Sequence, residues 1–202
     1  MKELKELPAG WRWATLGDVC KPDRQIVPPE SEQSLLLPYI SLEHIESETG
    51  RILKEPIEGV EDEGKSTTFL FDKQHVLYGK LSPYLNKVAL PSFRGRCTTE
   101  LIPLLPNRGI SRDFLAFTLR RPEVVKAAMR GNTGSRMPRA NMDELLKEKI
   151  PLPPLPEQRR IAALLTEQLA VVEQARKAAE AQLAAINDLP ATLLRQAFTG
   201  AT

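Results

Sequence analysis

Hydrophobic and polar positions alternate over short distances in the first hundred residues, which is typical of β-strands. The opening stretch LPAGWRWATLGDVC predicts a short strand or turn that places Trp11 and Trp13 on the surface, and residues 22–34, rich in Pro, Ser and Glu, predict a loop. A turn is expected around Ser82 and Pro83. Four further strands are predicted, at residues 38–42, 74–77, 87–90 and 97–104.

The spacing of apolar residues changes from strand-like to helical after residue 110. SRDFLAFTLRRPEVVKAAMR predicts two helices, the first capped by Ser111 and the second beginning at Pro122. The GNTGSRMPRA stretch ends the second helix, and NMDELLKEKI predicts a short helix or the lead-in to a strand. Strands followed by helices indicate an α+β fold for a globular domain at residues 1–150.

Residues 157–188 contain no Gly or Pro and predict one long helix. A helix of about 32 residues would be about 48 Å long. Its apolar positions recur in steps of four and three, which is typical of a coiled-coil seam. The seam consists of Leu165, Leu169, Val172, Arg176, Ala179, Leu183 and Ile186. Such a stripe needs a second helix, in this chain or in a second copy, and a homodimer with these residues as the dimer interface is expected.

Two details of this helical region need explanation. Arg176 interrupts the seam and would need a carboxylate such as Glu173 or Glu180, from either helix. Pro190 is expected to end the helix before a short terminal helix, TLLRQAF.

The run PLPPLP, residues 151–156, directly precedes the long helix. Prolines favour extended geometry in the preceding residue, so this run predicts a stiff joint. The expected organisation is therefore a domain at 1–150, a joint at 151–156 and a helical region at 157–202. A PxxP ligand for an SH3 domain is disfavoured, because such ligands usually lie in disordered tails.

The 202 residues carry a net charge of only +2, but the charge is unevenly distributed. Residues 80–139 hold 12 basic and 3 acidic groups, whereas residues 1–79 hold 9 and 15. A local excess of cations indicates a polyanionic partner, with nucleic acid as the leading candidate. A solvated basic face balanced by the acidic stretch EPIEGVEDE explains the same numbers, and charge alone does not separate the two.

Other sequence features narrow the class of protein. No apolar run approaches 18 residues and the N-terminus has no apolar leader region, so a soluble, cytoplasmic protein is expected. Cys20 and Cys97 form no metal-binding or disulfide pattern and predict two buried thiols. Phosphate-binding, dinucleotide, zinc-protease and serine-hydrolase motifs are absent from the sequence, so no catalytic residue, metal or cofactor is predicted.

The few titratable residues with catalytic potential form no recognisable group in the sequence. His44 and His75 have no partner that spacing would nominate, and each is interpreted as a surface or core imidazole. Asp18, Asp23 and Asp72 lie on separate predicted loops. These features favour a recognition module over an enzyme.

Four segments carry a family resemblance: LPAGWRWATLGDVC, YGKLSPYLNKV, GNTGSRMPRANMDELLKEKIPLPPLPEQRRIAALL and LLRQAFTG. Together they resemble the specificity subunit of type I restriction-modification systems, and PLPPLPEQRRIA is the most specific part. The resemblance implies a target recognition domain that reads half of a bipartite DNA site, and a helical spacer on which modification (methyltransferase) subunits dock. Methylation and cleavage would then belong to modification and restriction subunits.

The resemblance also raises the question of completeness. The family's usual chain has two recognition domains and two long helices, whereas this sequence has one set, so it resembles a half-subunit. It is either a short form that pairs with its own copy or part of a longer chain, and the ending AFTGAT favours the short form.

Candidate DNA-binding residues come from the basic third of the chain. Arg pairs well with guanine and Asn with adenine, while Lys suits phosphates. The candidates are Lys80, Ser82, Tyr84, Asn86 and Lys87 in GKLSPYLNK, Arg94 and Arg96 in the following predicted hairpin, and Asn132, Thr133, Ser135, Arg136 and Arg139 in GNTGSRMPR. Two rival functions remain: a coiled-coil adaptor with no DNA role, and a stand-alone metal-dependent nuclease.

Overall fold

A computed structural model describes residues 6–53, 66–130 and 136–199, and the chain divides into two compact units, residues 1–159 and 160–202. The elements of the first unit follow in chain order: β1 (Arg12–Thr15), α1 (Leu16–Val19), β2 (Cys20–Pro22), β3 (Ile26–Val27), α2 (Glu32–Leu36), β4 (Tyr39–Ile40), the 3-10 helix η1 (Leu42–His44), β5 (Thr68–Phe71), β6 (Val76–Gly79), the 3-10 helix η2 (Pro83–Leu85), β7 (Val88–Ala89), β8 (Gly95–Thr98), β9 (Leu101–Pro106), α3 (Arg112–Leu119), α4 (Pro122–Ala128), α5 (Met142–Leu146) and β10 (Lys149–Leu152). Helix α6 (Leu155–Thr199) begins in the first unit and makes up most of the second.

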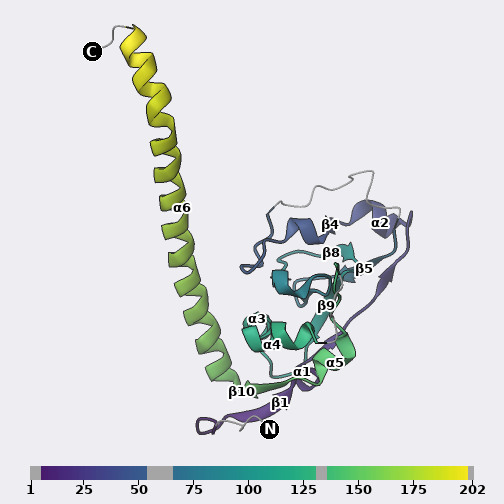
Figure 1. The fold of residues 1–202 in the computed structure, drawn as a ribbon. Helices are drawn as coiled ribbons and strands as arrows, with labels where there is room; N and C mark the ends of the chain where they lie inside the picture. Colours follow the sequence, from purple (N-terminus) through teal and green to yellow (C-terminus); the bar gives the residue numbers. More distant parts are fainter. Residues whose placement is uncertain (1–5, 54–65, 131–135, 200–202) are drawn as a thin grey trace. The chain divides into compact units, whose positions relative to one another are not determined.

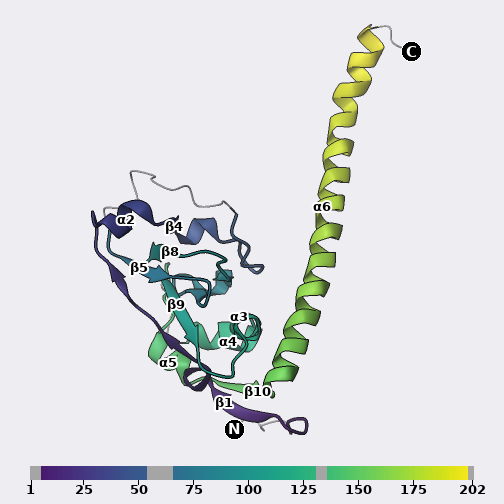
Figure 2. The same cartoon turned by 180° about the vertical axis from the view of Figure 1, so that it is seen from behind.

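Three small sheets form the framework of the first unit (Figures 1 and 2). One has the strand order β2-β9-β6-β7 and is antiparallel throughout. The second has the order β3-β5-β8-β4, in which only the β4–β8 pair is parallel. The third joins β1 to β10. Fully buried side chains such as Phe71, Leu77 and Leu104 come from the two larger sheets and form much of the core.

Helices α3 and α4 confirm the capping signals in the sequence. The Ser111 side chain accepts a hydrogen bond from the backbone N–H of Phe114 at the start of α3, and Pro122 occupies the first turn of α4. Helix α3 packs on β6 and β7, and α4 packs on α5 and η2. The mixed fold with a long C-terminal helix agrees with the predicted α+β class.

Several strand predictions were displaced or incomplete. The predicted strand at 97–104 is two strands in different sheets, because the chain turns at Thr99 and Glu100 to pass from one sheet to the other. Strand β5 was missed altogether, and the predicted loop at 22–34 contains β3 and the start of α2. For the strands, pairing with a distant strand decides the conformation, and local patterning does not contain that information.

The proline run is only partly the joint that the sequence predicted. Its first two residues belong to β10, where Pro151 lies opposite Trp13 of β1. A two-stranded sheet leaves each strand an unpaired edge, and a proline is tolerated there because it has no N–H to donate. Pro156 lies in the first turn of α6, where the backbone N–H groups have no partner within the helix.

Gln158 anchors the first turn of α6 within the first unit. Its side chain is 2% exposed. Its Oε1 accepts a hydrogen bond from the Ser111 N–H at 2.9 Å, and its Nε2 donates to the carbonyl of Pro153 at 3.0 Å and, more weakly, to that of Gly109 at 3.4 Å. The start of the long helix is therefore bonded both to its own joint and to the segment that leads into α3.

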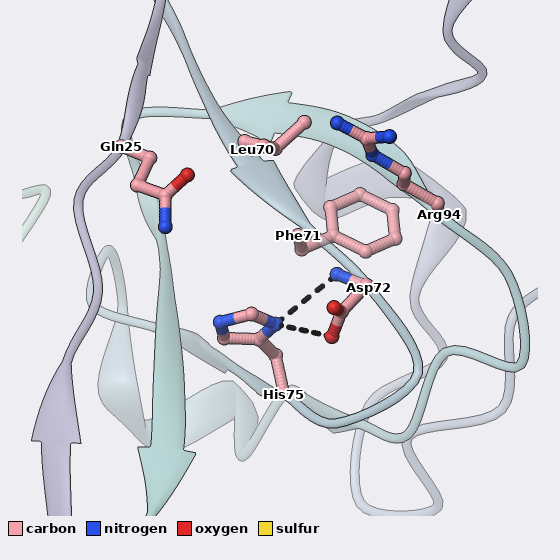
Figure 3. A pocket seen from close by; sticks show the side chains of 6 residues that line it. All are labelled: Gln25, Leu70, Phe71, Asp72, His75 and Arg94. Atoms are coloured by element: carbon pink, nitrogen blue, oxygen red, sulfur yellow. Dashed lines mark hydrogen bonds and ion pairs between the residues drawn. The ribbon is translucent and has the colours of Figure 1, made fainter.

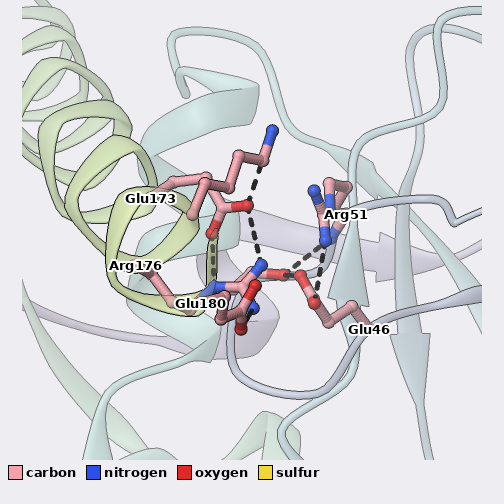
Figure 4. Close-up of polar contacts among 7 residues, drawn as sticks. Glu46, Arg51, Glu173, Arg176 and Glu180 are labelled. Carbon is pink, nitrogen blue, oxygen red and sulfur yellow. Dashed lines mark hydrogen bonds and ion pairs between the residues drawn. The ribbon is translucent and has the colours of Figure 1, made fainter. Parts of the chain in front are cut away.

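Helix α6 runs for 45 residues without a break, about 68 Å at 1.5 Å per residue. The prediction that Pro190 ends the helix was therefore wrong, as was the separate terminal helix, because Pro190 lies inside α6. Arg176 pairs with Glu173 at 2.8 Å and with Glu180, both on its own helix (Figure 4). The predicted need of Arg176 for a carboxylate is therefore met within one chain.

The seam of α6 presents apolar side chains to solvent. Leu169, Val172, Leu183 and Ile186 are between 49% and 62% exposed, while Leu165 is half-buried. Beyond Pro190 the same spacing reaches Leu193, which is 61% exposed. Within the described residues, no helix combines the length and the apolar character needed to cross a membrane.

Gln158→Ala should lower the free energy of unfolding by about 2–4 kcal/mol, because it removes the hydrogen bonds of a buried amide and leaves the Ser111 N–H unpaired. Urea denaturation followed by circular dichroism measures this loss. Gln168→Ala, at an exposed position of the same helix, is the matched control and should change the unfolding free energy by less than about 0.5 kcal/mol. Equal effects of the two substitutions would contradict the anchoring role.

Candidate nucleic-acid interface

The two loops nominated for DNA contact lie side by side. Leu81 and Arg139 form an isolated antiparallel β-bridge. On either side of it, the Ser82 N–H donates to the Pro138 carbonyl at 2.7 Å and the Ala140 N–H donates to the Lys80 carbonyl at 2.8 Å. Segments 56 or more residues apart in sequence thus form a single surface, although three of the nominated residues, Asn132, Thr133 and Ser135, lie outside the described residues.

We call this region the joined-loop surface and define it as Lys80, Ser82, Tyr84, Leu85, Arg136, Met137 and Arg139. Its apolar members are well exposed, with Tyr84 at 52%, Leu85 at 37% and Met137 at 58%. Arg136 and Arg139 are also exposed, whereas Lys80 and Ser82 are half-buried. Aromatic and apolar side chains beside arginines suit a partner that offers both flat apolar groups and negative charge.

Backbone geometry explains why Tyr84 and Leu85 project outward. The 3-10 helix η2 is enclosed by Ser82 and Asn86, which both have left-handed backbone conformations, with φ of 50° and 51°. Such conformations are uncommon for residues with a side chain, and asparagine tolerates them better than most. Between these two positions Pro83 is buried, whereas Tyr84 and Leu85 are exposed.

Asn86 supports this loop from inside and does not belong to the surface. It is 7% exposed, and its Nδ2 donates to Glu48 Oε2 at 2.8 Å and to the Arg120 carbonyl at 3.1 Å. Lys87 is also engaged, because its Nζ donates to the Leu42 carbonyl at 2.7 Å and burial lowers its pKa. Both side chains therefore have hydrogen-bond partners inside the protein, and a DNA contact by either one stays a prediction.

The underside of the loop is closed by Arg120. Its Nη2 donates to the Val88 carbonyl, and burial lowers the pKa of its guanidinium, partly offset by the charge of Glu48. Gly50, with φ of +69°, passes so close that a Cβ there would lie 1.7 Å from the Val88 oxygen. Only glycine fits at this position. The close approach of the chain at Gly50 brings the nearby Glu48 within hydrogen-bonding distance of Asn86.

Arg94 and Arg96 do not join this surface. Arg96 is 3% exposed, with its guanidinium 4.8 Å from the centre of the Tyr39 ring, so it is a core cation–π partner. Arg94 is exposed, but together with His75 it lines a small pocket. His75 directly precedes β6, whereas Lys80 of the joined-loop surface directly follows this strand, so the pocket and the surface lie at opposite ends of β6.

This pocket, of about 280 Å³, shows a group that the sequence did not predict (Figure 3). His75 is 7% exposed; its Nδ1 lies 2.9 Å from Asp72 Oδ1 and its Nε2 lies 3.3 Å from Asp23 Oδ2. Burial raises the pKa of Asp72, but hydrogen bonds from Gln74 and His75 and the charge of Arg94 outweigh it, and the net shift is downward. These groups satisfy one another and tie the β2–β3 connection to the β5–β6 turn.

The sequence analysis interpreted His75, Asp23 and Asp72 as unconnected residues, and this interpretation was wrong. Asp23 is 52 residues from His75, a separation at which no spacing rule applies. The interpretation of His75 as a core imidazole agrees with its burial. His44 accepts a hydrogen bond from the Ser41 N–H through Nδ1 at 3.0 Å, which is a local turn contact.

Glu100 is the residue at this surface that sequence reasoning missed. Its carboxylate binds Arg139 Nε at 3.1 and 3.2 Å and lies 4.0 Å from Lys80 Nζ. The sequence did contain one signal that could have identified Glu100: it is one of only three acidic side chains in the basic segment 80–139.

Metal and thiol chemistry receive no positive support from the described residues. Within them, no three His, Cys, Asp or Glu side chains are arranged to hold a metal ion. Cys20 and Cys97 are buried free thiols, as predicted, and burial raises the pKa of Cys20 to about 12. A thiol with such a pKa is inert at neutral pH.

The family model for the type I restriction modification DNA specificity domain matches residues 8–181. The chain belongs to this family. Among curated relatives, it is 27% identical to the EcoDI type I restriction enzyme specificity subunit of Escherichia coli, over 98% of this chain and 44% of the relative. It is 29% identical to the EcoAI specificity subunit of the same organism, over 94% of this chain and 33% of the relative.

Solved structures agree with this assignment. The HsdS subunit from Thermoanaerobacter tengcongensis matches with a TM-score of 0.73 and 27% identity, over 96% of this chain and 50% of that one. A structure that describes complex assembly and conformational transition of the type I R-M system matches with a TM-score of 0.71 and the same identity and coverage. The chain thus spans half or less of the length of these relatives.

These matches confirm three of the predictions: the family, the α+β fold with a long helix, and a recognition subunit in place of an enzyme. The individual DNA-binding and dimer residues stay predictions.

Asn86→Ala should lower the free energy of unfolding by about 2 kcal/mol, because it removes the amide donor of the Arg120 carbonyl and places alanine in a left-handed conformation. Tyr84→Ala, two residues away and exposed, should cost less than about 0.5 kcal/mol. Chemical denaturation of both variants measures the difference, and an unchanged stability for Asn86→Ala would show that the loop does not depend on it.

Proposed function

We propose that this chain reads one half of a bipartite DNA site through the joined-loop surface. One observation carries the proposal: the β-bridge between Leu81 and Arg139 brings the two basic loops together and leaves arginine and tyrosine side chains exposed on them. The family match supports a role in specificity, and the excess of basic residues at 80–139 supports a polyanionic partner.

The residues of this surface suit different parts of a duplex. Lys80 and Arg136 can bind phosphates, which fixes the position of a protein on DNA without reading its sequence. Arg139 can bind guanine in the major groove with two hydrogen bonds, and the exposed rings and methyl groups of Tyr84, Leu85 and Met137 can contact thymine methyl groups. A surface of this composition would therefore read bases as well as bind backbone.

For the helical region we propose pairing with a second copy of the chain. The relatives are at least twice as long as the part that matches, so a second recognition unit has to come from another copy or from the rest of a longer polypeptide. The exposed seam of α6 supports pairing, since apolar side chains at heptad spacing are stabilised by a facing helix. A symmetric pair would read two inverted half-sites.

Such a pair would act within a larger complex in the cytoplasm. The proposal assigns methylation to modification (methyltransferase) subunits that dock on the helical region, and cleavage to a restriction subunit brought through them. This chain alone should bind DNA and leave it chemically unchanged. A stand-alone nuclease would instead cut DNA with Mg²⁺ and no partner.

Arg136→Glu should weaken binding of the full chain to its preferred duplex at least about tenfold, because it replaces a phosphate-binding cation with a repelling anion. Fluorescence anisotropy with a duplex selected from a random-sequence library measures this. Arg108→Glu, at an exposed position between β9 and α3, is the charge-matched control and should have little effect. Unchanged binding by the Arg136 variant would remove this loop from the interface, and affinity insensitive to salt in the native chain would favour the adaptor without a DNA role.

Leu183→Glu should convert a dimer into a monomer, because it places a charge at an apolar position of the proposed seam. Light scattering on a sizing column measures the mass, expected near twice 22.6 kDa for the native chain. Ala184→Glu, one residue further along the helix and off the seam, is the control and should stay dimeric. A native chain that runs as a monomer would contradict pairing with its own copy.

A further inference from the structure

Glu100 lies in the turn that takes the chain from β8 to β9, between the two basic loops of the joined-loop surface. Its side chain is 23% exposed, and its backbone carbonyl accepts a hydrogen bond from the Lys80 N–H at 2.9 Å. Two strands of different sheets meet at this turn, so the position of Glu100 is set by both of them. The carboxylate is therefore a fixed feature of the surface.

The contact with Arg139 has a definite geometry. Both carboxylate oxygens accept from Arg139 Nε, at 3.1 and 3.2 Å, while the Arg139 side chain remains 53% exposed. The backbone of Arg139 is held independently by its bridge to Leu81. A planar guanidinium that is held at its Nε and at its backbone has its plane and direction restricted.

The charge of Glu100 has a second effect. With Lys80 Nζ at 4.0 Å and Arg139 Nε near 3 Å, one anion lies between two of the cations of the surface. An anion beside phosphate-binding cations weakens attraction to any DNA, whatever its sequence. An oriented arginine, in contrast, strengthens binding only where a guanine lies in the right place.

We infer that Glu100 is a specificity-determining positioning residue: it orients Arg139 for base recognition and weakens sequence-independent binding. This inference rests on the proposed DNA-reading function and deepens it. Specificity is the difference between the affinity for the preferred site and the affinity for other sequences. Glu100 acts on both affinities, and it raises the first relative to the second. A carboxylate that served only stability would change the two affinities together.

Glu100→Gln tests this in the full chain, because it keeps the size of the side chain and removes its charge. Binding is measured by fluorescence anisotropy, at two salt concentrations, to a duplex selected from a random library and to a scrambled duplex of the same length. Affinity for the scrambled duplex should rise about threefold, and the ratio of the two affinities should fall about tenfold, which is the size of effect expected when a bidentate base contact is lost.

Glu148→Gln is the matched control. Glu148 is 19% exposed and pairs with Arg130 at 2.8 Å, and neither residue belongs to the joined-loop surface, so this variant loses a similar ion pair and should keep the native affinity ratio. Arg139→Lys is the second variant. It keeps the charge but not the planar fork, and should lower the ratio without raising affinity for the scrambled duplex.

The outcomes separate the inference from the function on which it rests. If Glu100→Gln lowers both affinities by the same factor, or behaves like Glu148→Gln, Glu100 has no role in specificity and the inference is overturned. If the native chain binds selected and scrambled duplexes equally, the DNA-reading function itself fails. Thermal unfolding of each variant shows whether a general loss of binding comes from loss of fold.

Discussion

The antiparallel pairing of β1 with β10 is the contact that joins the beginning of the first unit to its end. It joins residues 12–15 to residues 149–152, so the chain enters and leaves the unit along the same two-stranded sheet. Ile150 and Ala14, which face each other in this pair, are both buried. From its end, only two residues lead to α6, and the buried amide of Gln158 bonds the first turn of that helix to the segment before α3. The proline run fits this place because each proline falls where a backbone N–H has no partner to lose.

The joined-loop surface also depends on a few contacts between residues far apart in the sequence. Two backbone hydrogen bonds, which form the bridge between Leu81 and Arg139, unite its loops, and buried side chains below them, Asn86 and Arg120, hold the turn in a backbone conformation that is uncommon for residues other than glycine. The polar residues nominated from sequence thus divide between two roles. Those that are buried hold the shape, and those that are exposed can contact a partner. This division follows from burial, because a buried polar group is stable only when its hydrogen bonds are made inside the protein.

The sequence predicted features that depend on neighbouring residues. The Ser111 cap, the proline start of α4 and the helical character of residues 157–188 are all set by side chains within a few positions, and the structure contains each of them. The features that the sequence did not predict depend instead on residues far apart in the chain. Strand β5, the junction of Asp23 with His75, and the Glu100–Arg139 pair all join residues 39 or more positions apart, or depend on a strand from elsewhere in the chain. Charge counting found the basic third, but only the fold shows which cations lie together.

Pro190 shows how a local rule is outweighed. A proline inside a helix removes one hydrogen bond and crowds the carbonyl four residues earlier, at a cost of about 3 kcal/mol. The residues on both sides, including Leu183, Ile186 and Leu193, continue one apolar stripe, and a break at 190 would separate its two parts. In an isolated helix this stripe would contribute little, since its side chains are exposed. Packed against a facing helix, each buried leucine or isoleucine contributes about 1.5–3 kcal/mol, so two or three of them offset the proline. The length of α6 is therefore the length expected if this helix pairs with a second copy, as proposed.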